Sequence, residues 1–95
     1  MSSINANNQR LADLAEAVIF TDTKGQDHNA LVTAVWGPTC VNLLWVSDDT
    51  DKKDQYGRQI ERNSSVPHVS MAGAHGYYFR FRDEEKKMAQ APIAN

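Results

Sequence analysis

Residues 30–46 of this chain read ALVTAVWGPTCVNLLWV, and this stretch decides the fold. It contains two runs of β-branched and other apolar residues, which favour the pleated and partly buried surface of a strand. Gly37 and Pro38 separate the two runs and can continue neither strand, so the chain turns there. The stretch therefore predicts an antiparallel hairpin at the centre of a small sheet, with strands at about 27–36 and 40–46.

Three further segments with strand-type sequence flank this hairpin. Residues 17–21 precede it, and Gly25 permits the connecting turn because glycine readily adopts positive φ. Residues 58–63 and 77–82 follow it, and Pro67 ends ladder pairing between them because proline lacks an N–H donor. Five short strands predict a mainly β fold, a small antiparallel barrel of SH3-like or alternatively OB-like type, since closure removes exposed sheet edges.

The two ends of the chain predict elements outside the sheet. Four apolar residues recur at helical spacing, and they are Leu11, Leu14, Ala15 and Val18. Asn7 or Asn8 can cap the first turn of this short N-terminal helix by accepting a bond from an unpaired N–H. Residues 83–95 form a polar C-terminal tail, so the expectation is a single domain over residues 1–95 with an ordered core at about 8–82.

Composition limits the classes of partner and compartment. Ten Lys and Arg residues against twelve Asp and Glu residues give a net charge of −2, which disfavours a general nucleic-acid binder. No apolar run approaches the roughly 20 residues of a transmembrane helix, and the N-terminal residues do not resemble a signal peptide. The single cysteine, Cys40, has no internal disulfide partner, so a cytoplasmic and reducing environment is expected.

The residues that could act as nucleophiles lack a catalytic context. Cys40 opens an apolar strand and is expected to serve as a small core residue. Ser64 and Ser65 lack the Gly-x-Ser-x-Gly pattern of a nucleophile elbow. The sequence therefore predicts a protein that is not an enzyme and that needs no cofactor.

Candidate metal ligands are scattered in the same way. No pair among His28, His68, His75 and Cys40 has the short spacing of a zinc site. The acidic segment 48–54 contains two lysines and lacks the glycine of a calcium-binding loop, so a solvated loop is expected there. No metal site is predicted.

A basic and aromatic group of residues is the main candidate for a ligand site. Arg58 and Arg62 share one side of their strand, and Tyr78 and Arg80 share the outer face of the last strand. If these strands lie close together, guanidinium groups that match phosphate or carboxylate gather beside a stacking ring. The alternative is that each arginine pairs with a neighbouring acid such as Glu61. The candidate ligand-binding residues are Arg58, Arg62, Ser64, Ser65, His68, Tyr78 and Arg80.

The central strands predict an interface between subunits. By alternation Val32 and Trp36 lie on one face of the first hairpin strand, and Leu31 and Val35 lie on the opposite face. A small barrel has only one inner face, so the second apolar face must meet the N-terminal helix or another subunit. A homo-oligomer is therefore expected, with Trp36, Leu31, Val35 and Trp45 as candidate interface residues.

Several uncommon residues recur in an order that carries a family resemblance. The patterns are His28-x-Ala30-Leu31-Val32-Thr33-x-Val35-Trp36-Gly37, Cys40-Val41-Asn42-Leu43, Asp54-x-Tyr56-Gly57-Arg58-Gln59 and Ser64-Ser65-Val66-Pro67-His68. In these segments, over residues 18–82, the chain resembles a family of small, mostly uncharacterised proteins of tailed bacteriophages. The resemblance implies a viral source and an all-β core, and it transfers no activity to individual residues.

Three hypotheses for function remain open. The leading one is a homo-oligomeric structural or interaction protein that binds other phage or host proteins, in the virion or in the host cytoplasm. The second is an anti-defence protein that sequesters a phosphorylated nucleotide-type small molecule at the Arg and Tyr residues above. The third, binding of single-stranded nucleic acid on the barrel face, is disfavoured by the net charge, and no membrane partner is expected.

Overall fold

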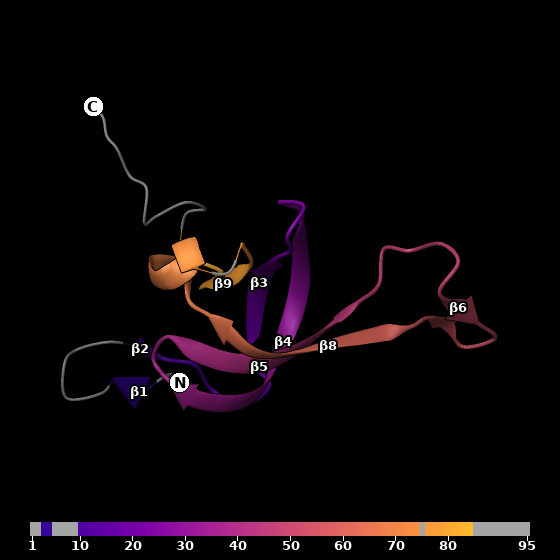
Figure 1. The fold of residues 1–95 in the computed structure, drawn as a ribbon. Coiled ribbons are helices and arrows are strands. Elements are labelled where there is room, and N and C mark those ends of the chain that lie inside the picture. The colour runs from indigo at the N-terminus through magenta and orange to yellow at the C-terminus, as the bar shows by residue number, and fades with distance from the viewer. Residues whose placement is uncertain (1–2, 5–9, 75, 85–95) are drawn as a thin grey trace.

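A five-stranded antiparallel sheet dominates the computed structural model, which describes residues 3–4, 10–74 and 76–84 (Figure 1). Its spatial order is β8-β5-β4-β3-β9. The strands are β3 (Ala17–Thr21), β4 (Asp27–Gly37), β5 (Cys40–Val46), β8 (Ile60–Pro67) and β9 (Tyr78–Phe81). Two minor pairs join β1 (Ser3–Ile4) to β2 (Arg10–Leu11) and β6 (Lys53–Asp54) to β7 (Gly57–Arg58). A 3-10 segment, η1 (Val69–Ala74), connects β8 to β9.

The predicted central hairpin is confirmed. β4 and β5 pair antiparallel from Ala30 opposite Trp45 to Gly37 opposite Cys40, with the turn at Pro38 and Thr39. β-branched and other apolar residues favour the strand conformation in both segments, and the Gly-Pro step between them produces the turn.

A bulge in β4 changes which side chains reach the core. The pairing register shifts between Val32 and Ala34, so strict alternation fails at this point. Val32 is buried, and Val35, three residues later, also packs against the core. Trp36 consequently points outward and is 66% exposed, whereas the sequence placed it on the same face as Val32.

The expected N-terminal helix is wrong. Within the described residues, Arg10 and Leu11 form strand β2, and the following residues form a turn in which Ala15 has a φ of 65°. The backbone there bonds to β4: the Ala15 N–H donates to the Val32 carbonyl, and the Val32 N–H donates to the Glu16 carbonyl. A left-handed residue cannot continue an α-helix, and pairing to the sheet satisfies the same backbone groups.

Parts of the predicted termini lie outside the described residues. These are the capping candidates Asn7 and Asn8 and residues 85–95 of the predicted polar tail. Asp83 and Glu84, at the start of that tail, form a turn against β9, in which the Glu84 N–H donates to the Phe81 carbonyl.

The sheet is not closed into the expected barrel. β8 and β9 form its two edges, and a single described bridge, between His68 and Phe79, joins the segments at their ends. Pro67 ends β8 because it has no N–H to continue the ladder, and the chain then enters η1. The sheet is nevertheless strongly bent, and in Figure 1 β3 and β4 rise steeply from β5 and β8.

One face of this bent sheet holds the core. Val69 of η1 is buried, and the residues that form the core cluster come from the sheet and the turn before β3: Ala12, Val18, Phe20, Ala30, Val32, Val41, Leu43, Val66, Phe79 and Phe81. The opposite face carries apolar side chains that stay in solvent, including Leu31, Val46 and Ile60. β6 and β7 lie at the far end of a long arm, away from both faces (Figure 1).

Candidate functional site

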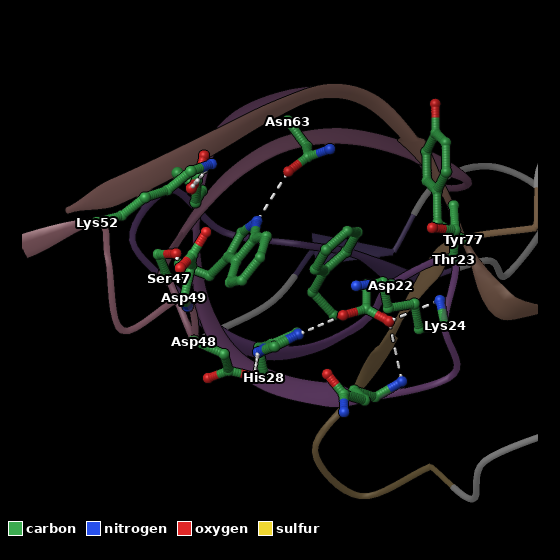
Figure 2. A pocket seen from close by; sticks show the side chains of 14 residues that line it. Asp22, Thr23, Lys24, His28, Ser47, Asp48, Asp49, Lys52, Asn63 and Tyr77 are labelled. Atoms are coloured by element: carbon green, nitrogen blue, oxygen red, sulfur yellow. Dashed lines mark hydrogen bonds and ion pairs between the residues drawn. The ribbon is translucent and has the colours of Figure 1, made fainter. Parts of the chain in front are cut away.

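A cavity of about 690 Å³ opens on the inner side of the sheet, beyond the apolar core. Its walls come from the β3–β4 turn, the inner faces of β4, β5 and β8, the loop after β5, and Tyr77 before β9 (Figure 2). The lining contains four aromatic rings, four carboxylates and two lysines. We call it the aromatic–acidic cavity.

The aromatic wall follows from strand register. Phe20 lies opposite His28 in the β3–β4 pair, and Trp45 lies opposite Ala30 in the β4–β5 pair. The ring centroid of Trp45 lies 4.1 Å from that of His28 and 5.5 Å from that of Phe20. The ring centroid of Tyr77 lies 6.3 Å from that of Phe20. Neighbouring positions on one face of a sheet thus produce a continuous row of rings.

His28 is held from both sides by carboxylates. Its Nε2 lies 2.8 Å from Asp22 Oδ2, and its Nδ1 lies 3.3 Å from Asp48 Oδ2. The side chain is only 5% exposed. Both nitrogens can donate at once only when the ring carries two protons, because an ionised carboxylate only accepts. His28 therefore ties the β3–β4 turn to the loop that follows β5.

Asp22 organises the β3–β4 turn as well as His28. Its Oδ1 accepts the backbone N–H groups of Lys24 (2.8 Å) and Gln26 (3.0 Å), a side-chain turn typical of aspartate. Burial opposes ionisation of this carboxyl, but the hydrogen bonds from His28, Gln26 and Lys24 outweigh it and lower the pKa of Asp22 below its usual value.

Trp45 is fixed at its polar edge. Its indole Nε1–H donates to Asn63 Oδ1 at 2.8 Å, across the β5–β8 pair. Figure 2 shows Asn63 on the far side of the cavity from His28. The indole is therefore oriented by a hydrogen bond on one side and by the tilted imidazole of His28 on the other, while part of it remains accessible.

The charge of the lining is negative. Four carboxylates stand against two ammonium groups, an excess of two negative charges with His28 neutral and of one with His28 protonated. Lys52 already pairs with Glu61 at 3.1 Å. The carboxylates are Asp22, Asp48, Asp49 and Glu61, and the ammonium groups belong to Lys24 and Lys52.

A second cavity of about 190 Å³ surrounds His68, one of the predicted ligand residues. His68 Nε2 lies 2.7 Å from Glu84 Oε1, and its Nδ1 lies 3.0 Å from Ser70 Oγ. The Ser70 backbone N–H also donates to Nδ1, at 3.2 Å. This hydroxyl–imidazole–carboxylate series therefore caps the start of η1 and attaches it to the end of β9.

The remaining predicted ligand residues do not form one cluster. Arg58, Arg62, Ser64 and Ser65 lie on β7 and β8, whereas Tyr78 and Arg80 lie on β9, at the opposite edge of the sheet. The bend brings the C-terminal end of β8 close to β9 at the His68–Phe79 bridge, whereas Arg62 lies further back in β8, opposite Leu44 of β5. Arg58 donates to the Asp48 carbonyl at 2.9 Å, and Arg80 pairs with Asp27 at 3.3 Å, so both arginines have protein partners.

The four predicted interface residues lie in four different places. Trp36 is exposed at the end of the hairpin, where its indole donates to Asn42 at 2.9 Å. Leu31 is 43% exposed on the outer face of the sheet. Val35 packs against the core, and Trp45 lines the aromatic–acidic cavity.

Of the residues that line this cavity, Trp45 was predicted as an interface residue, and none was predicted as a ligand-binding residue. Asp48 belongs to the acidic segment 48–54, for which the sequence predicts a solvated loop. One signal was available in the sequence. His28 and Ala30 are two residues apart, so they lie on the same face of β4, and Ala30 lies opposite Trp45 of β5. Nothing in the spacing of Asp48 indicates that the loop folds back onto that strand.

Comparisons with known proteins assign no family to the chain: no family model matches it, and no significant match was found among curated proteins or solved structures. In the part of the chain that the structure describes, no helix is long and apolar enough to cross a membrane. The same residues contain no group of three or more His, Cys, Asp or Glu side chains placed to hold a metal ion.

Proposed function

We propose that the protein acts by binding rather than by catalysis, and that the aromatic–acidic cavity is its ligand site. The observation that carries the proposal is the orientation of Trp45, which Asn63 and His28 fix beside a cavity of about 690 Å³. Ligand sites are typically hollows of roughly 300–1,000 Å³ in which aromatic walls meet a few fixed polar groups. A rigid indole also costs little conformational entropy when it contacts a ligand.

A fragment screen by NMR tests this proposal. The chain contains two tryptophans, and only Trp45 lines the cavity. Its indole N–H signal is assigned by comparison with Trp36→Phe, and a panel of neutral, anionic and cationic aromatic and aliphatic compounds is added. The expected result is that some compounds shift the Trp45 signal and leave that of Trp36 unchanged. A panel that never moves the Trp45 signal would reject the cavity as the ligand site.

Self-association is the second candidate function, as a homo-oligomeric structural or interaction protein. It is favoured by the outer face of the sheet, where Val46 lies directly opposite Ile60 and both are more than half exposed. Leu31 and Leu44, which also face each other across strands, extend the same apolar row. Such a row on a small protein is typical of an interaction surface.

Light scattering after size-exclusion chromatography tests the second candidate. Ile60→Glu is expected to reduce the measured mass to that of the 10.6 kDa monomer. Tyr56→Glu is the matched control, since Tyr56 is 88% exposed on the distant β6–β7 arm. A wild-type protein that is monomeric at micromolar concentration would remove this candidate. Mass spectrometry of purified phage particles then tests whether the protein is a virion component, as the phage resemblance suggests.

We also propose that the bent sheet is an SH3-like rather than an OB-like arrangement. In support, the first long strand, β3, pairs with both the second, β4, and the last, β9. A 3-10 segment precedes the last strand, and the described residues contain no α-helix between the third and fourth strands of the sheet. An experimental structure, in which the distance between β8 and β9 can be measured, is the test.

A further inference from the structure

We propose that the aromatic–acidic cavity recognises an organic cation, an alkylammonium or guanidinium group such as the end of a lysine or arginine side chain. The inference rests on the proposed binding function and names the chemical class of its ligand. The supporting observation is that aromatic rings and more carboxylates than ammonium groups surround one cavity of about 690 Å³.

The rings supply the first part of the recognition. The face of an indole or benzene ring carries partial negative charge and attracts a cation within roughly 6 Å of its centroid. Trp45 packs on Phe20, with ring centroids 5.5 Å apart, and Phe20 is only 2% exposed, so the partly accessible indole of Trp45 supplies the ring surface that a cation in the cavity can contact. Tyr77, 6.3 Å from Phe20, extends this surface toward the start of β9.

The carboxylates supply the second part. Asp22 bonds to His28 and to two backbone N–H groups, Asp48 lies 3.3 Å from the other ring nitrogen of His28, and Glu61 pairs with Lys52. Asp49 is different, because its Oδ1 accepts the Asp51 N–H at 2.9 Å and its carboxylate forms no ion pair within the described residues. Asp49 is therefore the carboxylate that a bound cation would meet.

The same charges oppose the other ligand class. A phosphate or carboxylate in this cavity would lie beside an excess of negative charge, even when His28 is protonated. The arginines that would suit such an anion do not line the cavity: Arg58 donates to the Asp48 carbonyl in the loop that forms one wall, and Arg80 pairs with Asp27. The cavity thus selects against the phosphorylated ligand that the sequence suggested for the arginine residues.

The experiment compares matched probes on the full chain by NMR titration. The probes are N-acetyl-arginine amide, its uncharged isostere N-acetyl-citrulline amide, N-acetyl-lysine amide and N-acetyl-glutamate amide. A Gly/Ser decapeptide with one central arginine forms the second arm, with its citrulline counterpart. We expect the arginine probes to shift the Trp45 indole signal with at least tenfold higher affinity than their citrulline counterparts, and the glutamate probe to give no shift.

Two variants test the position of the bound cation. Asp49→Asn removes the charge but keeps an oxygen that accepts the Asp51 N–H, so the loop is preserved. Asp51→Asn removes the same charge from the same loop, at an exposed residue outside the cavity. We expect Asp49→Asn to weaken arginine binding at least fivefold and Asp51→Asn less than twofold.

The possible outcomes separate this inference from the proposed function. If only the arginine peptide binds tightly, the natural ligand is a polypeptide that carries the cation. If the N-acetyl-arginine amide binds equally well, the cavity recognises the cationic group without a surrounding peptide. Both results support the inference. Equal affinity of arginine and citrulline, stronger binding of glutamate, or equal loss in the two aspartate variants would overturn it while the ligand site stands. If no fragment of any charge shifts the Trp45 signal, the proposed function fails together with the inference.

Discussion

The imidazole of His28 packs against the indole of Trp45 in a tilted arrangement, with ring centroids 4.1 Å apart and planes at 33°. The contact joins neighbouring strands, β4 and β5, and it also links two loops, because His28 bonds to Asp22 in one and to Asp48 in the other. The wall of the cavity and the stability of its rim therefore depend on the same side chain.

Replacement of His28 by alanine is expected to lower the free energy of unfolding by about 2–4 kcal/mol, because it removes a buried ring and leaves two carboxylates without their partner. Urea denaturation followed by circular dichroism measures the change. Lys53→Ala, on the exposed β6 strand, is the control and should change stability by less than about 0.5 kcal/mol. A His28→Ala protein as stable as this control would contradict the stabilising role of the His28 contacts with Asp22 and Asp48.

Stability should fall in acid through Asp22. The pKa of this carboxyl is lowered in the folded protein, so its contribution is complete above the unfolded value of about 3.8 and is lost as the pH falls through the lower folded value. Thermal melts between pH 2.5 and 6 are the measurement. Asp22→Asn should be less stable than the wild type by roughly 1–2 kcal/mol at pH 6, and the difference should shrink below pH 4. A difference that is constant with pH would show that ionised Asp22 does not stabilise the fold.

The two tryptophans should respond differently to truncation. Trp36 is 66% exposed, so Trp36→Ala should cost no more than about 1 kcal/mol, mainly from the hydrogen bond to Asn42. Trp45 packs against the core and against the His28 ring, so Trp45→Ala should cost about 3–5 kcal/mol. Chemical denaturation of both variants in parallel tests this order, and the reverse order would mean that the sheet register around Trp36 is wrong.

Loss of the Glu84 side chain should loosen the end of β9. Glu84 Oε1 accepts bonds from both His68 Nε2 and the Phe81 N–H, so Glu84→Ala should destabilise the protein by about 1–3 kcal/mol. It should also accelerate hydrogen exchange of the η1 amides, notably that of Met71, which bonds to the His68 carbonyl. The neighbouring Asp83→Ala, at an exposed position, is the control, and equal effects of the two variants would argue against the His68–Glu84 pair.

The sequence by itself determined the local part of this structure. The Gly-Pro step between two β-branched runs produced the β4–β5 hairpin with nearly its observed bounds, and Asp22 with Gly25 produced the turn before β4. These features depend on backbone preferences of a few consecutive residues, which do not change with the rest of the fold. The same reasoning failed at Ala15, where pairing with β4 replaced a helix that only a few apolar residues supported.

Only the tertiary structure decided the faces, the edges and the site. The bulge at residues 32–34 turned Trp36 outward, and the ladder order placed Arg62 and Arg80 on opposite edges of the sheet. The cavity required the loop carrying Asp48 to fold back onto His28, a contact between residues 20 positions apart. Register shifts and loop returns are set by the sum of many long-range contacts, so no short pattern encodes them, whereas a turn is set by the residues that form it.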